Sequence, residues 1–315
     1  MKVLVAGATG AIGRPLVVKL IERGHQVTGM TRSEKRRELI EWLGADSVVV
    51  DALDPEGVAG AVAETRPDVI VHELTALAGP FDLKDPEKTF GPTNRLRREG
   101  TDHLLSAARA AGVKRFVAQS FAPLIYERTG SLVKTEADPV DTHPPAAMTD
   151  VSEAMRYLER AVTSADGIEG VVLRYGGFYG EGTSMDVRPD GEQTEMIRKR
   201  RLPIVGSGGG VWSFVHVDDA AEATAIAVEK GEPGIYNIVD DQPAPVRDWL
   251  PAVAEAIGAR PPRRFPRWLA RLVAGEAGVM MMTEMRGSSN QKAKRELGWS
   301  PAHPAIWETL AGSEA

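Results

Sequence analysis

The stretch VLVAGATGAIGRPLVVKLIERG, residues 3–24, constrains the fold more than any other part of the chain. An apolar run rich in β-branched residues ends at Gly7, and a pattern of helical period follows Gly13. Gly7 allows a tight turn, Gly10 lets backbone approach a pyrophosphate, and Gly13 lets the helix pack closely on the sheet. The predicted cofactor contacts of this turn are Gly7, Thr9, Gly10, Ala11, Ile12 and Gly13. The alternative is a strand-to-helix turn of the same shape that holds no ligand.

Short apolar runs alternate with longer helical patterns through the first half of the chain. The expected strands are KVLVAG, QVTGMTR, SVVVD, PDVIVHEL, RFVAQS and GVVLRYG, and helices are expected between them, including 94–111 and 151–163. Such alternation favours parallel strands with helices on both faces. We therefore predict the α/β class, as a Rossmann-type doubly wound parallel sheet with a smaller C-terminal substrate lobe. Residues 1–175 and about 213–240 are assigned to the sheet domain, and about 176–212 and 241–315 to the lobe.

Composition excludes several classes of function. The net charge of −6 argues against a nucleic-acid partner, and the absence of cysteine excludes thiolate catalysis and zinc–thiolate sites. The apolar runs are shorter than the ~20 residues that cross a bilayer, and the start of the chain lacks the shape of a signal peptide. We expect a cytoplasmic protein with a small-molecule substrate and no membrane partner, and the oligomeric state, a homodimer included, stays open.

The end of the second strand indicates which cofactor is preferred. NAD-binding proteins usually place an acidic residue there for the ribose 2′-hydroxyl, whereas this chain reads GMTRSEKRR. Arg32 and Ser33 suit a 2′-phosphate, so NADP(H) is favoured over NAD(H); the alternative for Arg32 is a solvated surface charge. Asp51 and Ala52, which follow the third strand, are expected near the adenine, and a turn carboxylate is the alternative for Asp51.

Six segments give the chain a recognisable likeness: GATGAIG (7–13), GTDHLLSAARAAGVKRFV (100–117), VVLRYGGFYGEG (171–182), SFVHVDDAAEA (213–223), GIYNIVDD (234–241) and KAKRELGWSP (292–301). In this order they resemble the extended short-chain dehydrogenase/reductases, in the epimerase/dehydratase branch and its atypical relatives. The resemblance implies further cofactor contacts after the fourth and sixth strands. These are Leu74, Thr75, Ala76, Tyr175, Gly177 and Phe178.

The catalytic Tyr-x-x-x-Lys pair of that superfamily is missing here. The tyrosines are Tyr126, Tyr157, Tyr175, Tyr179 and Tyr236, and none is followed by lysine four positions later. Alignment on GVVLRYG places Met148 and Ser152 where the pair should stand. Ser120 is retained from the usual Ser/Thr region, but Phe121 occupies the position whose hydroxyl normally faces the substrate. Met148 and Phe121 would make this wall apolar and unable to transfer a proton.

Three residues remain as candidates for catalysis. Tyr126 follows the fifth strand and could donate a proton if Lys134 or Arg128 lowered its pKa, and loop packing is the alternative. Asn94 shares a helical face with Arg97, which stands where the resemblance implies an asparagine, and surface polarity is the alternative for both. Ser120 is the third candidate.

The substrate is expected to be small and largely apolar, such as a carbonyl compound or an enone. Trp212 stands where sugar-nucleotide relatives usually carry an arginine for the diphosphate, and a core tryptophan is the alternative. Arg286 could bind an anion. The predicted substrate contacts are Phe121, Met148, Tyr179, Trp212 and Arg286. No metal site is expected, because the His216–Asp219 segment offers too few ligands.

The functional prediction is an NADP(H)-binding oxidoreductase with a non-standard proton donor. Two alternatives stay open: a catalytically silent regulator that senses NADP(H), and a non-redox lyase or isomerase on the same scaffold. NADPH consumption with a carbonyl panel separates the first from the others.

Overall fold

A seven-stranded parallel sheet forms the centre of the computed structural model, which describes residues 1–77, 86–188 and 191–312. From one edge to the other the strands are β3 (Asp46–Val49), β2 (Gln26–Thr31), β1 (Lys2–Ala6), β4 (Val69–His72), β5 (Arg115–Phe121), β7 (Glu169–Tyr175) and β12 (Gly234–Ile238). The order reverses between β1 and β4, so the predicted doubly wound α/β fold is confirmed.

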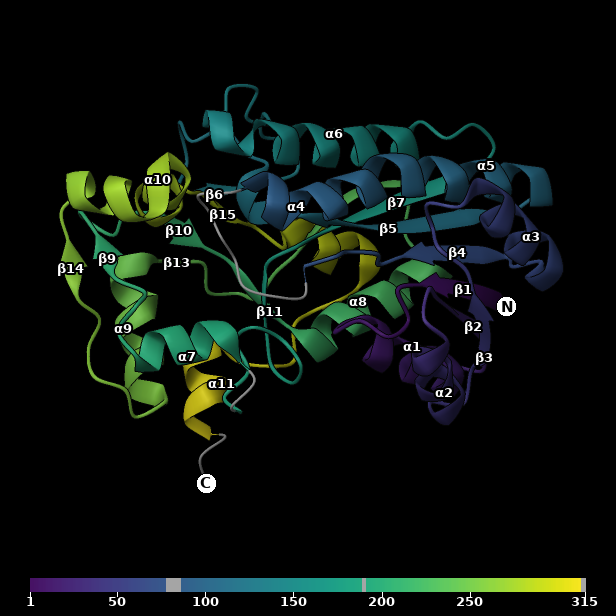
Figure 1. Ribbon diagram of the computed structural model, residues 1–315, viewed down its shortest axis with the longest axis horizontal. Coiled ribbons are helices and arrows are strands. Elements are labelled where there is room, and N and C mark those ends of the chain that lie inside the picture. The colour runs from purple at the N-terminus through teal and green to yellow at the C-terminus, as the bar shows by residue number, and fades with distance from the viewer. Residues whose placement is uncertain (78–85, 189–190, 313–315) are drawn as a thin grey trace.

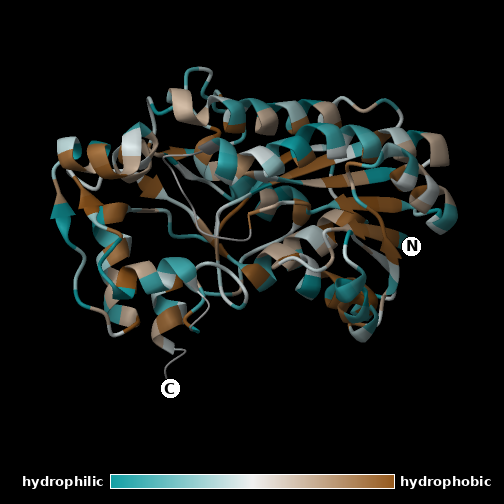
Figure 2. Ribbon diagram, in the orientation of Figure 1, coloured by the Kyte–Doolittle hydropathy of each residue, from teal (hydrophilic) through white to brown (hydrophobic). Residues whose placement is uncertain are grey.

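Helices cover both faces of the sheet (Figure 1). One face carries α1 (Gly13–Glu22), α2 (Glu34–Trp42) and α8 (Val217–Glu229), and the other carries α3 (Pro55–Thr65), α5 (Thr101–Ala111) and α6 (Thr149–Thr163). Figure 2 shows apolar strands enclosed by helices whose outer faces are hydrophilic. The fold thus buries the sheet on both sides, as parallel sheets require.

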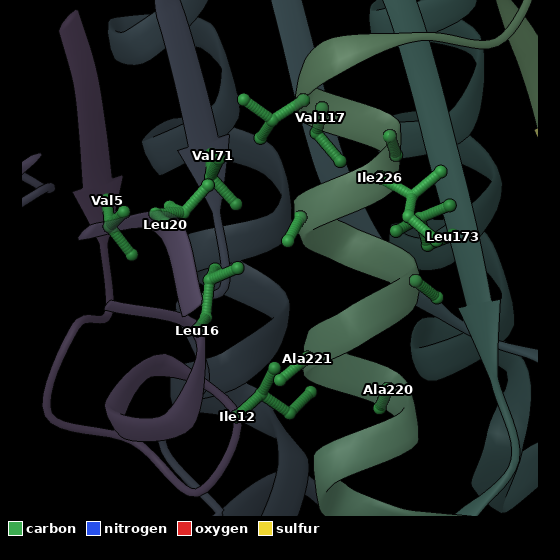
Figure 3. Close-up of a cluster of buried hydrophobic side chains, with 14 of the residues drawn as sticks. Val5, Ile12, Leu16, Leu20, Val71, Val117, Leu173, Ala220, Ala221 and Ile226 are labelled. Atoms are coloured by element: carbon green, nitrogen blue, oxygen red, sulfur yellow. The ribbon is translucent and has the colours of Figure 1, made fainter. Parts of the chain in front are cut away.

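The core beneath α1 and α8 fixes the position of the glycine turn (Figure 3). Ile12, at the end of that turn, packs with Leu16 and Leu20 of α1 and with the small residues Ala220 and Ala221 of α8. The strands contribute the opposing side chains, which include Val5, Val71, Val117 and Leu173. Because alanines line α8, the two helices approach closely and hold the turn against the sheet.

The helix expected over 94–111 is longer than predicted. It begins as α4 (Pro86–Arg95), widens into a π-helical turn η1 (Leu96–Gly100), and continues as α5. Gly91 and Pro92 lie within α4 and obscure its helical pattern in the sequence. Single π-helical turns occur frequently at functional sites.

A second hydrophobic cluster lies away from the sheet, on the left of Figure 1. Trp249, Phe214, Ile204 and Ile306 belong to it. Its helices are α7 (Glu192–Arg198), α9 (Val246–Ala256), α10 (Arg267–Thr283) and α11 (Ile306–Gly312). The division into domains stays a prediction.

Short strands and turns complete the chain. The strands are β6 (Val133–Lys134), β8 (Gly177–Tyr179), β9 (Ile204–Val205), β10 (Val211–Trp212), β11 (Phe214–His216), β13 (Ala244–Pro245), β14 (Arg264–Phe265) and β15 (Gly287–Ser288), and the turns are η2 (Ala122–Leu124), η3 (Ala146–Met148) and η4 (Ala293–Leu297). The segment WSFVHV, expected as one strand, is divided between β10 and β11, which pair with different partners. Over the described ranges, no helix is both long and apolar enough to cross a bilayer.

Candidate active site

The glycine turn lies at the switch point between β1 and β4, where open α/β sheets bind ligands. Gly7 has a φ of +97°, and a Cβ atom there would lie 2.7 Å from the carbonyl oxygen of Glu73. A Cβ atom on Gly13 would lie 2.2 Å from the carbonyl oxygen of Gly7. Both positions therefore require glycine for the backbone to close.

The outer part of the turn is open enough for a dinucleotide phosphate. Gly10 is exposed, Thr9 and Ala11 are half-buried, and Ile12 is anchored in the core. In the first turn of α1 the N–H groups of Arg14 and Leu16 already donate to the carbonyl oxygens of Gly10 and Ile12, and Pro15 has no N–H. The N–H groups of residues 11–13 have no partner among the described residues and remain available to a phosphate. A side chain at Gly10 would occupy this approach, so the residues present fit a bound dinucleotide.

Arg14 was not identified from the sequence and adds a cation to this turn. It lies in the first turn of α1, its Nε is 3.4 Å from the carbonyl oxygen of Gly10, and it forms no ion pair with a described residue. Its Nη2 atom lies 2.2 Å from where a Cβ atom of Gly182 would stand, so the guanidinium reaches the loop after β8. A cation at a helix N-terminus is destabilised by the positive end of the helix dipole. A bound phosphate would offset this unfavourable interaction. Its place directly after GATGAIG was the available signal.

The end of β2 presents free hydrogen-bond donors. Arg32 is exposed and pairs with no acid among the described residues, while Arg37 is held by Glu34 and Glu41 at 3.1 and 2.8 Å. Ser33 precedes α2, and its hydroxyl does not cap that helix. Arg32 and Ser33 are thus available to a ligand beyond the strand.

The third strand is followed by a turn in which the carboxylate of Asp51 is already hydrogen-bonded. The Asp51 carboxylate accepts from the Leu53 N–H at 3.0 Å, which agrees with the alternative of a turn carboxylate. Ala52 is buried, and its carbonyl oxygen lies 2.9 Å from Nδ1 of His103.

The end of β4 and the loop that follows it are each tied to the long helix. The Ala76 N–H donates to the hydroxyl of Thr93 at 3.0 Å, and Nε2 of His72 lies 3.1 Å from the Thr101 hydroxyl. Leu74 is half-buried, and Thr75 is exposed. Burial lowers the pKa of His72 to about 4, so the ring is neutral.

A buried carboxyl group, Glu73, lies directly below this loop. It accepts from the Tyr175 hydroxyl at 3.0 Å, and its Oε2 atom is sealed from solvent without a partner. Burial raises the pKa of Glu73 to about 8. The Tyr175 hydroxyl also lies 2.7 Å from the Thr224 hydroxyl, so its side chain points into the core, and only its backbone can reach a cofactor. Phe178 packs on the Tyr175 ring at 5.4 Å, and Gly177 leads into β8.

An apolar wall forms at the start of α6. Met148 is buried and belongs to one cluster with Val151 and Met280, and Phe121 packs against the same cluster. A cavity of about 10 Å³, enough for one water, lies beside Met148. The sequence placed Met148 and Phe121 on one wall, and the structure brings them together.

Arg286 lines the same cavity. Its Nη2 donates to the carbonyl oxygen of Arg128, and its Nε is sealed without a partner. Its role as an anion-binding group stays a prediction.

The expected activation of Tyr126 is wrong. Its hydroxyl donates to Asn237 at 2.7 Å and accepts from Arg174 at 2.9 Å, and Lys134 instead donates to the carbonyl oxygen of Thr129. Burial raises the pKa of Tyr126 to about 12. A hydroxyl that is buried and held at both ends is part of the fold rather than a proton donor to substrate.

Ser120 also serves the interior. Its hydroxyl donates to Glu159 at 2.7 Å, and Glu159 accepts from Arg174 at 2.8 and 2.6 Å. All three side chains are buried. The catalytic role expected of Ser120 is therefore corrected to support of a buried ion pair.

Asn94 is held at both ends of its amide. Its Nδ2 donates to Asp150 at 2.6 Å, and its Oδ1 accepts from Arg97 at 3.2 Å. Asp150 also accepts from Arg98 at 2.7 Å. Asn94 therefore positions Arg97, and its expected part in catalysis stays a prediction.

Two aromatic residues predicted to contact substrate lie in the second cluster. Tyr179 is fully buried and donates to the carbonyl oxygen of Pro304 at 2.6 Å, so its expected place in a substrate wall is wrong. Trp212 is half-buried, donates to the carbonyl oxygen of Met281 at 2.9 Å and packs on Trp249 at 5.1 Å. Its predicted contact with substrate remains untested.

His303, which the sequence did not connect with this region, joins His216 and Asp218. Their ligand atoms lie within 4.8 Å of one another, but the two rings are stacked with centroids 3.6 Å apart. Stacked imidazoles direct their lone pairs side by side rather than toward one ion. Nδ1 of His216 already accepts from the Asp218 N–H at 3.2 Å. The arrangement suits a helix cap better than a metal centre.

Comparisons with known proteins bear on this geometry. A model of the NAD dependent epimerase/dehydratase family matches residues 3–239. A Streptomyces protein named 3-diazoavenalumate denitrifying reductase is 44% identical over 315 residues, which cover 100% of both chains. The 2-alkyl-3-oxoalkanoate reductase of Stenotrophomonas maltophilia is 31% identical, over 82% of this chain and 76% of that protein. The structure of Thermus thermophilus UDP-glucose 4-epimerase in complex with NAD is 28% identical, with a TM-score of 0.74 over 99% of this chain and 97% of that chain.

Proposed function

The chain belongs to the NAD-dependent epimerase/dehydratase family and is an NAD(P)-dependent oxidoreductase; from that premise, we propose that it reduces a diazo compound with NADPH and releases dinitrogen. In its diazonium form the substrate gains a C–H bond at the carbon that carried nitrogen. The C–N bond breaks, and its electron pair leaves with N₂. The atoms and charges balance as R–N₂⁺ + H⁻ → R–H + N₂.

The observation that supports this reaction is the apolar wall of Met148 and Phe121. Reduction of a carbonyl leaves an alkoxide, which requires a proton donor or other stabilisation. Tyr126 and Ser120 are both engaged in buried hydrogen bonds and do not supply one. Replacement of N₂ by hydride leaves no anion at the reacting carbon, so an apolar wall is sufficient.

The similarity to the Streptomyces protein supports the same choice of substrate. Its name states a diazo compound and a denitrifying reduction, and the identity of 44% extends over both full chains. The substrate named there is also a carboxylate. We therefore propose a diazo carboxylate as the substrate class of this protein, with an aryl body that suits the apolar wall.

The proposed cofactor is NADPH, which when bound supplies the hydride. The turn at Gly7–Gly13 would hold its pyrophosphate, and Arg14 would add a cation at the same place. Arg32 and Ser33 would bind the 2′-phosphate, because neither side chain is occupied within the described residues. This assignment develops the expectation of NADP(H) over NAD(H).

The test is a turnover assay with 3-diazoavenalumate and NADPH. We expect NADP⁺ and N₂ in a ratio of one to one, and slower or absent turnover with a panel of ketones. Reduction of the ketones without N₂ release would instead favour carbonyl reduction, for which the relative at 31% identity provides the precedent. NADPH binding with no turnover of either substrate class would support the silent sensor.

A further inference from the structure

A guanidinium without an acidic partner, that of Arg97, lies inside the protein beside the site. The residue is 7% exposed, and its one hydrogen bond within the described ranges is from Nη1 to Oδ1 of Asn94 at 3.2 Å. No described carboxylate lies within 4.0 Å of it. Its remaining nitrogens are not among the buried atoms that are sealed from solvent without a partner.

The positive charge of Arg97 is not balanced by the acidic groups around it. Glu159 is a nearby acid, but it is bound at two points by Arg174. His72 is neutral, and Asp150 is paired with Arg98. Burial lowers the pKa of Arg97 to about 10, which still leaves it protonated at neutral pH. An unpaired buried cation is costly unless an anion joins it.

The neighbours of Arg97 show which way it faces. Thr93 and Thr101 lie four residues before and after it, on the same side of the helix. Thr93 bonds to Ala76, and Thr101 approaches His72. Arg97 therefore faces the loop after β4, at the carboxyl edge of the sheet. Arg97 lies in the widened turn η1, and single π-helical turns occur frequently at functional sites.

We propose that Arg97 binds an oxyanion of the substrate, with Asn94 as its positioning residue. The oxyanion is a carboxylate or a phenolate, since both present a charged oxygen to a guanidinium. This inference rests on the proposed function in that it takes an acidic aryl compound as the substrate. It adds the residue that selects such a compound.

Binding of unreactive probes to the protein–NADP⁺ complex tests the proposal without requiring turnover. Titration calorimetry would compare benzoate, 4-hydroxybenzoate and methyl 4-hydroxybenzoate. Arg97→Gln should weaken the affinity of the protein for whichever probe presents the recognised oxyanion by about 10- to 100-fold. This is the effect expected for loss of a hydrogen bond to a charged group. Arg95→Gln is the matched control, because Arg95 is on the same helix but is exposed and paired with Glu99 at 2.8 Å.

The probes distinguish the two sources of the oxyanion. Loss of affinity for both acids, with the ester unaffected, assigns a carboxylate. Loss confined to the two phenols, and growing with pH as they ionise, assigns a phenolate. Arg97→Lys should retain part of the affinity in either case.

Thermal unfolding distinguishes this role from a purely structural one. If Arg97 is an unpaired buried cation, the Tm of Arg97→Gln should equal or exceed that of the unmodified protein. If Arg97 instead supports the fold, the Tm of the variant should be lower. Equal affinities of Arg97→Gln and the unmodified protein for all probes would overturn the inference, as would a loss that falls on NADP⁺ instead. Because the probes do not react, failure of diazo reduction alone would leave this result standing and refute only the proposed function.

Discussion

Arg32 is the residue whose replacement should separate the two nicotinamide cofactors. In the free protein it is exposed and forms no ion pair with a described residue, so binding of a 2′-phosphate breaks no existing contact. Hydrogen bonds to charged groups contribute roughly 1.5–3 kcal/mol, and exposure to solvent and salt places Arg32 in the lower part of that range. Arg32→Ala should therefore weaken NADPH by about 1.5–2 kcal/mol, or roughly 10- to 30-fold.

The assay is a fluorescence titration of both reduced cofactors at two ionic strengths. NADH affinity should change less than about twofold, and the NADPH effect should shrink at high salt. Arg37→Ala is the control, because Arg37 belongs to the same segment but is already paired with Glu34 and Glu41. Equal losses for NADPH and NADH, or tighter binding of NADH by the unmodified protein, would refute the reasoning.

Three further predictions concern the interior. Tyr126→Phe should keep its turnover but lose about 1–3 kcal/mol of stability, because Arg174 and its other partner are left unsatisfied; a large loss of turnover at unchanged NADPH affinity would contradict this. Because the pKa of Glu73 is raised to about 8 in the folded protein, its burial costs stability increasingly as pH rises from about 4.5 to 8. Glu73→Gln should thus gain Tm relative to the unmodified protein between pH 5 and 8, and a constant difference would count against a neutral Glu73. Gly13→Ala should abolish measurable NADPH binding, since its Cβ has no room, while Gly60→Ala, in open space on α3, should bind normally.

The framework of the fold follows from local sequence, and much of the site does not. The glycine turn and the alternation of patterns are local signals, and they predicted the parallel sheet and the position of α6. Tyr126 could not be assigned from its neighbours in sequence. Its partners Arg174 and Asn237 lie 48 and 111 residues away, on β7 and β12.

Arg97 shows a different limit. The sequence placed Arg97 on one helical face with Asn94. What singles it out is that no described acid pairs with it, and this depends on all the elements packed around it. Glu159 is a plausible partner until Arg174 is seen to hold it at two points. Arg14 is the contrary case, because its position after the last glycine of the turn was a local signal.

The central claim is that hydride replaces dinitrogen directly, without a proton from the protein. The most direct test is turnover of 3-diazoavenalumate with NADPH that carries deuterium at C4, followed by mass spectrometry and NMR of the product. We predict one deuterium at the carbon that carried the diazo group, and none at that carbon when unlabelled NADPH is used in D₂O. Deuterium from the solvent at that carbon, or retention of the nitrogen with hydride delivered to a carbonyl, would contradict the account.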